Sequence, residues 1–196
     1  EIFIKKVLSR VSLDVYKQLR DLQIPGIPII HDLILENDSL ILIEDYIHGQ
    51  TLEQLLAEQT TLVYSDALAI MRKLCDVLKS LHTLTPPIIH RDLKLSNIIL
   101  TSENLVYIVD FDTARYYESG QEQDTELLGT KEYAPPEQYG FGQSDARSDI
   151  YALGIIFNRL LTGEYPKHQL ADDRYRSVIS KCIRWNPEER FQTVEE

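Results

Sequence analysis

A polar loop between a long amphipathic helix and a hairpin constrains the fold of this chain more than any other feature. Over residues 65–81, apolar residues recur at helical spacing for more than four turns, and a proline pair ends the pattern. The loop at residues 90–97 reads HRDLKLSN, and two β-rich runs within residues 98–109 then return the chain to Asp110. The helix exit and the returning strand are therefore predicted to bring polar side chains together.

The side chains of this loop match the needs of one kind of reaction. Asn97 and Asp110 carry hard oxygen atoms of the type that holds Mg²⁺ between a protein and phosphate groups. Asp92 can accept a proton from an incoming hydroxyl, and Lys94 can neutralise charge on a transferred group. Positioning, a base and cations are what phosphoryl transfer requires. The loop therefore predicts a phosphoryl-transfer site.

The loop and the segments after it resemble the eukaryotic-type (Hanks-type) serine/threonine protein kinases. That family carries H-R-D-L-x-x-x-N in its catalytic loop and D-F-G shortly afterwards, where this chain has DFD at residues 110–112. The segment around residues 139–149 is most similar to the bacterial members. Further matching segments follow in the family's order: GTKEYAPPE at 129–137, DIYALG at 149–154 and NPEERF at 186–191.

The resemblance covers nearly the whole chain and implies an α+β, two-lobed protein-kinase-like fold. A β-rich small lobe would occupy residues 1–48, and a mainly α-helical large lobe would occupy residues 49–196. No G-x-G-x-x-G precedes Lys5, so the small lobe lacks the glycine-rich loop and we expect an N-terminally truncated catalytic domain. On this interpretation, residues 1–196 alone bind nucleotide weakly and have little or no activity.

Local patterns predict the individual elements. Ser12 is placed to begin a short helix, and Thr51 with Gln54 forms a capping-box pattern that opens another. Gly163 is placed to end a later helix. We expect strands at 2–8, 27–35, 40–47, 98–100 and 105–109, and helices at 65–81, 149–162 and 175–185 in addition to the two just named.

The resemblance implies a role for each polar residue of the loop. Asp92 would be the catalytic base, and Lys94 with Thr130 would steady the phosphate and the acceptor hydroxyl. Asn97 and Asp110 would hold the Mg²⁺ ions. Lys94 and the Gly-Thr pair that ends at Thr130 favour serine or threonine over tyrosine as the acceptor.

The resemblance also implies an ATP site. Lys5, at the end of the run IFIK, resembles the strand lysine that contacts the α- and β-phosphates, although the neighbouring Lys6 remains an alternative. The backbone of the hinge, at Asp45 and Ile47, would meet the adenine, and Ile99 would lie near the pocket floor.

Two further contacts follow from the resemblance. Glu137 and Arg190 would form the buried ion pair of the large lobe. Arg91 could pair with a phosphorylated residue in the segment after Asp112, and Thr125 is the first choice for that residue.

Departures from the family pattern leave a second interpretation open. Residues 2–35 contain no glutamate to pair with the strand lysine, and Asp14 is the nearest substitute. Asp112 stands where the family has glycine, and Glu44 is an unusually polar residue just before the hinge. These features favour a pseudokinase or protein-interaction scaffold with the same fold, whereas the intact loop opposes it. A kinase that acts on small molecules is the least favoured of the three functional interpretations, because such enzymes generally lack the motif at residues 129–137.

Charge and composition exclude several other functions. Acidic residues outnumber basic ones 31 to 20, and the net charge of −11 disfavours nucleic acid or an anionic membrane as a partner. No apolar run approaches the roughly 18 residues needed to span a bilayer, so we expect no membrane contact by this segment. Cys75 and Cys182 lack metal-ligand spacing and indicate buried thiols in a reducing, cytoplasmic setting. Expected partners are ATP and proteins that offer Ser or Thr hydroxyls, with a homodimer as one route to autophosphorylation.

Overall fold

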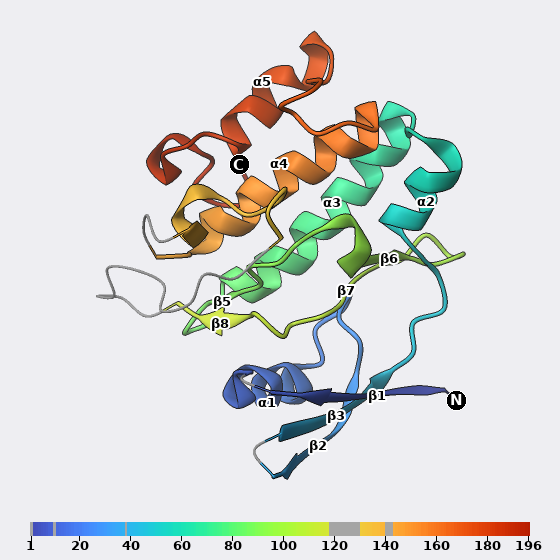
Figure 1. Cartoon of the computed structure of the whole chain (residues 1–196), viewed down its shortest axis with the longest axis vertical. Coiled ribbons are helices and arrows are strands. Elements are labelled where there is room, and N and C mark those ends of the chain that lie inside the picture. The colour runs from blue at the N-terminus through green and yellow to red at the C-terminus, as the bar shows by residue number, and fades with distance from the viewer. Residues whose placement is uncertain (1, 10, 38, 118–129, 140–142) are drawn as a thin grey trace.

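An antiparallel sheet with one helix packed against it forms one end of the molecule (Figure 1). The computed structural model of the protein describes residues 2–9, 11–37, 39–117, 130–139 and 143–196. Strands β2 and β3 pair as antiparallel neighbours and β1 pairs with β3, so the strand order in this sheet is β1-β3-β2. The elements are β1 (Phe3–Leu8), α1 (Leu13–Leu22), β2 (Ile30–Glu36) and β3 (Ser39–Asp45).

Helices make up most of the rest of the molecule. The two longest described helices, α3 (Tyr64–His82) and α4 (Ala146–Thr162), lie side by side (Figure 1). The shorter helix α2 (Leu52–Gln59) lies beside the start of α3, and α5 (Asp173–Cys182) packs against α4 (Figure 1). This division into a sheet and a group of helices confirms the predicted α+β fold class.

Short strands lie between the sheet and the helices (Figure 1). One small sheet has the order β4-β6-β7, and β5 pairs with β8. The polar loop at residues 90–97 runs from β5 into β6, so these strands fix both of its ends. The elements are β4 (Gln50–Thr51), β5 (Ile88–Ile89), η1 (Leu95–Asn97), β6 (Ile98–Leu100), β7 (Val106–Ile108), β8 (Arg115–Tyr116), η2 (Pro136–Tyr139) and η3 (Pro187–Glu189).

Capping explains where the helices begin and end. At the start of α2, the Thr51 side chain accepts from the Gln54 amide at 3.1 Å, and Gln54 accepts from the Thr51 amide at 2.9 Å, which confirms the capping box. Helix α4 begins three residues before the predicted start because the Asp145 side chain accepts from the Arg147 amide. It ends at Gly163, which adopts a φ of 74° as predicted for a terminating glycine.

One continuous apolar core joins the sheet to the helices. Val15 of α1 and Leu42 of β3 are fully buried, as are Leu74 and Leu78 of α3 and Ile156 of α4. Because burial of apolar area is the main stabilising term in folding, this core holds the sheet and the polar loop in one fixed arrangement.

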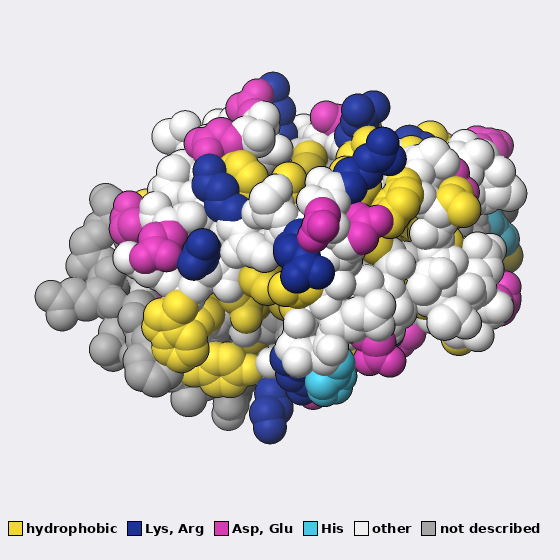
Figure 2. All heavy atoms as spheres, turned by 90° about the horizontal axis from the view of Figure 1, so that it is seen from above, with side chains coloured by type: hydrophobic (Ala, Val, Ile, Leu, Met, Phe, Trp, Pro, Cys, Tyr) yellow, Lys and Arg dark blue, Asp and Glu magenta, His cyan; other side chains and the backbone are white. Residues whose placement is uncertain are grey.

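The end of the molecule seen in Figure 2 carries acidic and basic side chains interspersed with apolar ones. Among the described residues, no helix is both long and apolar enough to cross a membrane.

Both cysteines, Cys75 and Cys182, are free thiols. Burial raises the pKa of the Cys75 thiol to about 11 and that of the Cys182 thiol to about 12. These thiols are therefore held in their unreactive, protonated form at neutral pH.

Candidate active site

A buried aspartate from α4 holds the start of the polar loop. The Asp149 carboxylate accepts the backbone amides of His90 at 3.0 Å and of Arg91 at 2.9 Å, one on each oxygen. His82 of α3 lies 2.9 Å from the same carboxylate. Burial raises the pKa of Asp149, but the hydrogen bond from His82 and the charges of His82 and His90 outweigh it, so the pKa lies below its ordinary value. Asp149 thus stays ionised and fixes the loop backbone.

Two turns of the backbone at the site adopt an uncommon conformation. Arg91 has a φ of 69° and Asp110 a φ of 68°, in the left-handed region that residues other than glycine seldom enter. Such residues cluster at functional sites, where the surrounding structure determines their conformation. Here the His90 ring stacks edge-on to Phe111, with ring centroids 4.7 Å apart, and links the two turns.

Asp92, Lys94 and Thr130 form one hydrogen-bonded group. The Lys94 ammonium donates to Asp92 Oδ2 at 2.6 Å and to Thr130 Oγ1 at 3.1 Å. The Thr130 amide and hydroxyl both donate to Asp92 Oδ1, at 3.0 and 2.8 Å. Both oxygens of the carboxylate are therefore oriented by specific donors, and the Asp92 side chain is about 12% exposed. The structure brings these three predicted residues together from two distant parts of the chain.

Asn97 connects this group to a cavity beside it. The Asn97 side-chain amide donates to the Asp92 carbonyl at 3.0 Å and to Asp92 Oδ2 at 3.4 Å. Its backbone carbonyl accepts the Val109 amide at 2.9 Å, which ties the loop to the strand that leads to Asp110. Asn97 and Asp110 both line the cavity. The predicted metal residues therefore lie on the same side of the molecule as Asp92.

The cavity has a volume of about 560 Å³ and lies between the sheet and the polar loop. The predicted nucleotide-contacting residues Asp45, Ile47 and Ile99 all line it. Its other lining residues are Ile4, Lys6, Val7, Leu8, Pro28, Glu44, Tyr46, Ser96, Asn97, Val109, Asp110 and Asp112. Apolar side chains and a few polar ones are typical of a site for a small molecule.

The hinge side of the cavity is already partly hydrogen-bonded. The Asp45 amide donates to the Ile29 carbonyl at 2.9 Å, and the Asp45 carboxylate lies 2.6 Å from His31. The Tyr46 amide donates to the Ile2 carbonyl at 3.1 Å. The amides of Asp45 and Tyr46 therefore donate within the fold.

The structure contradicts the prediction that Lys5 is the lysine that contacts the phosphates. Side chains alternate along β1, and Lys5 is exposed on the outer face, whereas Ile4, Lys6 and Leu8 face inward. Lys6 lines the cavity, and its ammonium lies 2.7 Å from the Glu44 carboxylate of β3. The resemblance of the run IFIK to the family's strand motif placed the phosphate-contacting lysine one residue too early. Leu8 is buried, and because alternate residues share a face, Lys6 faces inward with it.

Glu44 and Asp112 are carboxylates in partly or fully buried positions beside Lys6. Burial raises the pKa of Glu44 above its ordinary value, although Lys6 opposes the shift. Burial also raises the pKa of Asp112, against a hydrogen bond from Tyr16. The Tyr16 hydroxyl of α1 donates to Asp112 at 2.7 Å, and burial with this bond raises the pKa of Tyr16. Helix α1 therefore contacts the site through the hydroxyl of Tyr16.

Asp14 does not take the place of the missing helix glutamate. Its side chain is about 76% exposed and pairs with Lys17 one turn along the same helix, at 3.3 Å.

Thr125, the first choice for a phosphorylated residue, lies outside the described residues, as does Gly129. The Arg91 guanidinium donates to the Thr113 carbonyl at 3.4 Å.

The residues present suit a magnesium ion shared with phosphates. Within the parts of the chain that the structure describes, no three His, Cys, Asp or Glu side chains come together as a metal-binding group. Mg²⁺, however, is usually held by one or two carboxylates together with substrate phosphates and water. Asn97 and Asp110, which face the same cavity, supply an amide oxygen and a carboxylate of that kind.

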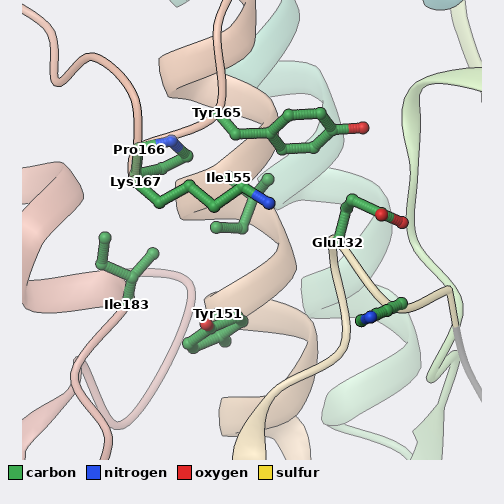
Figure 3. A pocket seen from close by; sticks show the side chains of 8 residues that line it. Glu132, Tyr151, Ile155, Tyr165, Pro166, Lys167 and Ile183 are labelled. Carbon is green, nitrogen blue, oxygen red and sulfur yellow. The ribbon is translucent and has the colours of Figure 1, made fainter.

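A second cavity of about 380 Å³ lies beyond Thr130, next to α4 (Figure 3). Ile155 and Ile183 form its apolar part, and the Lys167 side chain extends across it towards Glu132 (Figure 3). Tyr165 packs edge-on against Tyr133, which anchors this cavity to the segment that carries Thr130. The other residues that line it are Lys131, Tyr151 and Pro166.

The predicted ion pair of Glu137 and Arg190 is confirmed. The two side chains form two hydrogen bonds of 2.7 and 2.9 Å, and Arg190 is fully buried. Arg190 also donates to the carbonyls of Arg147, Arg184 and Trp185. The pair thus fixes the segment after Thr130 to the end of the chain.

Comparisons with known proteins agree with this geometry. A family model described as the protein kinase domain matches residues 10–195. The chain is 28% identical to a probable serine/threonine-protein kinase of Clostridium perfringens, over 91% of this chain and 29% of that protein. It is 30% identical to the serine/threonine-protein kinase PknB of Mycobacterium tuberculosis, over 79% of this chain and 29% of that protein.

A third relative is the serine/threonine-protein kinase PrkC of Bacillus subtilis, which is 32% identical over 83% of this chain and 26% of that protein. The chain thus spans less than a third of the length of these relatives. The family model, in contrast, covers nearly all of the chain, including the loop at residues 90–97. The chain therefore belongs to the protein kinase domain family.

Proposed function

We propose that this chain catalyses ATP- and Mg²⁺-dependent phosphoryl transfer to Ser or Thr hydroxyls of proteins. The observation that carries the proposal is the Asp92 carboxylate, which Lys94 and Thr130 orient and which Asn97 links to the cavity that Asp110 lines. Relatives named serine/threonine-protein kinases support the same activity. We propose a small lobe at residues 1–48 and a large lobe at 49–196 around this site.

Asp92 would act as the base. One of its oxygens accepts the proton of the acceptor hydroxyl as that oxygen attacks phosphorus, and the Thr130 donors keep the carboxylate turned towards it. Lys94, already within hydrogen-bonding distance of Asp92, neutralises charge on the transferred group. Mg²⁺, held by Asn97 and Asp110, would supply further positive charge at the phosphates.

The cavity beside the loop would hold the nucleotide. Ile47 and Ile99 offer apolar surface and backbone groups to the adenine, and the phosphates would extend towards Lys6 and Asp110. Because four carboxylates, Glu44, Asp45, Asp110 and Asp112, line the cavity, phosphates need both a local cation and metal ions to bind there.

The protein acceptor would lie on the other side of Thr130. The cavity of Figure 3 offers apolar side chains of α4 and a lysine close to the segment that carries Thr130. A peptide that places a hydroxyl at Asp92 could insert a neighbouring side chain there. We propose that the reaction takes place in the cytoplasm, where ATP is supplied and where free thiols such as Cys75 persist. Two copies of the protein could also phosphorylate each other.

A pseudokinase or scaffold is the alternative. The absence of a helix glutamate and the presence of Asp112 motivate it, but the ordered group around Asp92 has no evident purpose in a scaffold. The relatives, named as kinases, do not support it either.

Replacing Asp92 tests the proposal. In the full natural protein that contains this sequence, Asp92→Asn should lower transfer of labelled phosphate from Mg-ATP to Ser and Thr by about 10²–10⁴-fold. Asp66→Asn, an exposed aspartate on α3, is the matched control and should leave the rate unchanged. Phosphoamino-acid analysis identifies the acceptor. Unchanged transfer by Asp92→Asn, or label on tyrosine alone, would contradict the proposal.

A further inference from the structure

We propose that Glu44 of β3 is the positioning residue for Lys6, so that a strand carboxylate and not a helix carboxylate holds the lysine that meets the nucleotide phosphates. This inference rests on the proposed function. It concerns how one face of the sheet is arranged and depends on no residue of the polar loop.

The register of the sheet places the two side chains on one face. Ile4 lies opposite Glu44 and Lys6 lies opposite Leu42 in the antiparallel pair of β1 and β3. Alternate residues of a strand share a face, so Lys6 and Glu44 are diagonal neighbours on the inner face. Long side chains span that diagonal, and the Lys6 ammonium reaches Glu44 Oε1 at 2.7 Å. The pairing is thus built into the strand register.

Burial makes this pair more than a surface contact. Glu44 is about 6% exposed, and the Lys6 side chain is about 24% exposed. Removing one member of a buried pair leaves the other charge without compensation, which is costly, whereas exposed pairs contribute little. Glu44 therefore restrains a side chain whose four-carbon stem is otherwise flexible.

The charge of the cavity makes Lys6 important for an anionic ligand. Among the described residues that line the cavity, Lys6 is the only lysine or arginine. An ammonium has three N–H donors, so a bond to Glu44 leaves donors for phosphate oxygens. Asp112 also attracts the ammonium, and Glu44 holds it on the sheet side of the cavity, where it can meet phosphates that extend from the hinge.

Helix α1 offers no carboxylate for this task. Its buried side chains are those of Val15, Tyr16 and Leu19, and Asp14 points to solvent. Tyr16 uses its hydroxyl on Asp112. Since Glu44 supplies the counter-charge from the neighbouring strand, the missing helix glutamate does not argue for an inactive protein.

The test measures Lys6 and Glu44 singly and together in the full natural protein. The variants are Glu44→Gln, Glu44→Asp, Lys6→Met and the Lys6→Met/Glu44→Gln double variant. Lys5→Met, on the outer face of the same strand, is the matched control. For each, kcat and KM for Mg-ATP are measured by phosphate transfer, the dissociation constant for Mg-ATP by calorimetry, and the melting temperature by circular dichroism.

We expect Glu44→Gln to lower kcat/KM for Mg-ATP by about 10- to 100-fold, because a displaced ammonium no longer meets the phosphates. Glu44→Asp should recover part of the loss, and Lys5→Met should behave as the unaltered protein. The double variant should be no worse than Lys6→Met, since Glu44 acts through Lys6. Weaker Mg-ATP binding by Glu44→Gln, measured at a temperature at which circular dichroism shows the variant to be fully folded, separates positioning from a structural role.

Three results would overturn the inference: Glu44→Gln within twofold of the unaltered protein in both binding and kcat/KM, a gain in activity, or additive losses in the double variant. Asp92→Asn, assayed alongside, distinguishes the two proposals. If Asp92→Asn abolishes transfer while Glu44→Gln does not affect it, only the role of Glu44 is wrong. If Asp92→Asn leaves transfer intact, the proposed function itself fails, and Mg-ATP binding still reports whether Glu44 acts on Lys6.

Discussion

The polar loop and the small sheet both contribute charged groups to the site, but they are held in different ways. In the loop, Asp92 is oriented by Lys94 and Thr130, and the backbone before it is fixed by the buried Asp149. In the sheet, the position of Lys6 depends on strand register and on one carboxylate, Glu44. The loop is therefore determined by many bonds and the sheet side by few.

This difference suggests a division of labour. Groups that touch the reacting atoms need a fixed geometry, because small displacements reduce the rate strongly. A lysine that binds phosphates is a compact charge on a long stem, so a single counter-charge such as Glu44 can set its position. We therefore expect substitutions under the loop to cost both stability and activity, and substitutions in the sheet to act mainly on nucleotide binding.

The largest expected effect comes from the buried anchor of the loop. Asp149→Asn should lower the free energy of unfolding by about 3–5 kcal/mol, because an NH₂ group then faces a backbone amide donor that Asp149 now accepts. Phosphate transfer should fall with it. Chemical denaturation of the full natural protein measures the first effect, and the Mg-ATP assay the second.

Asp21→Asn, an exposed position on α1, serves as the control for this substitution and should change stability by less than about 0.5 kcal/mol. If Asp149→Asn were equally harmless, the contrast between a strongly held loop and a weakly held sheet would not survive.

A smaller effect compares helix starts in the two regions. Thr51 caps α2 with its side chain, whereas Ser12 occupies the same position at α1 without a side-chain capping bond. Thr51→Ala should therefore cost about 1 kcal/mol of stability, and Ser12→Ala close to nothing. Thermal unfolding of both variants under one set of conditions checks the difference. Equal losses would mean that the two helix starts do not differ as described.

Much of the loop could be predicted because its residues are contiguous. Asp92, Lys94 and Asn97 lie within six positions, and a short hairpin is enough to return Asp110 to them. Thr130 could be predicted because the segment GTKEYAPPE at residues 129–137 follows the loop in the same order as in the family. The pair of Glu137 and Arg190, 53 residues apart, followed from the family resemblance and not from local pattern.

The sheet side was harder to predict because its contacts depend on register and on pairing between distant segments. Lys5 and Lys6 differ only in which face of β1 they occupy, and a shift of one residue reverses that face. The contact of Glu44 with Lys6 and that of Tyr16 with Asp112 join segments that no local motif relates. Counting alternate residues back from the apolar Leu8 places Lys6 on the inner face of β1, and this pattern could have identified Lys6 from the sequence.

The central claim is that Asn97 and Asp110 hold Mg²⁺ and phosphates beside Asp92. A crystal structure of the full natural protein with Mg²⁺ and a non-hydrolysable ATP analogue tests it most directly. We predict a metal ion about 2.0–2.1 Å from oxygens of both Asn97 and Asp110, with the terminal phosphate facing Asp92. A nucleotide bound outside this cavity, or a metal ion that touches neither residue, would contradict the account.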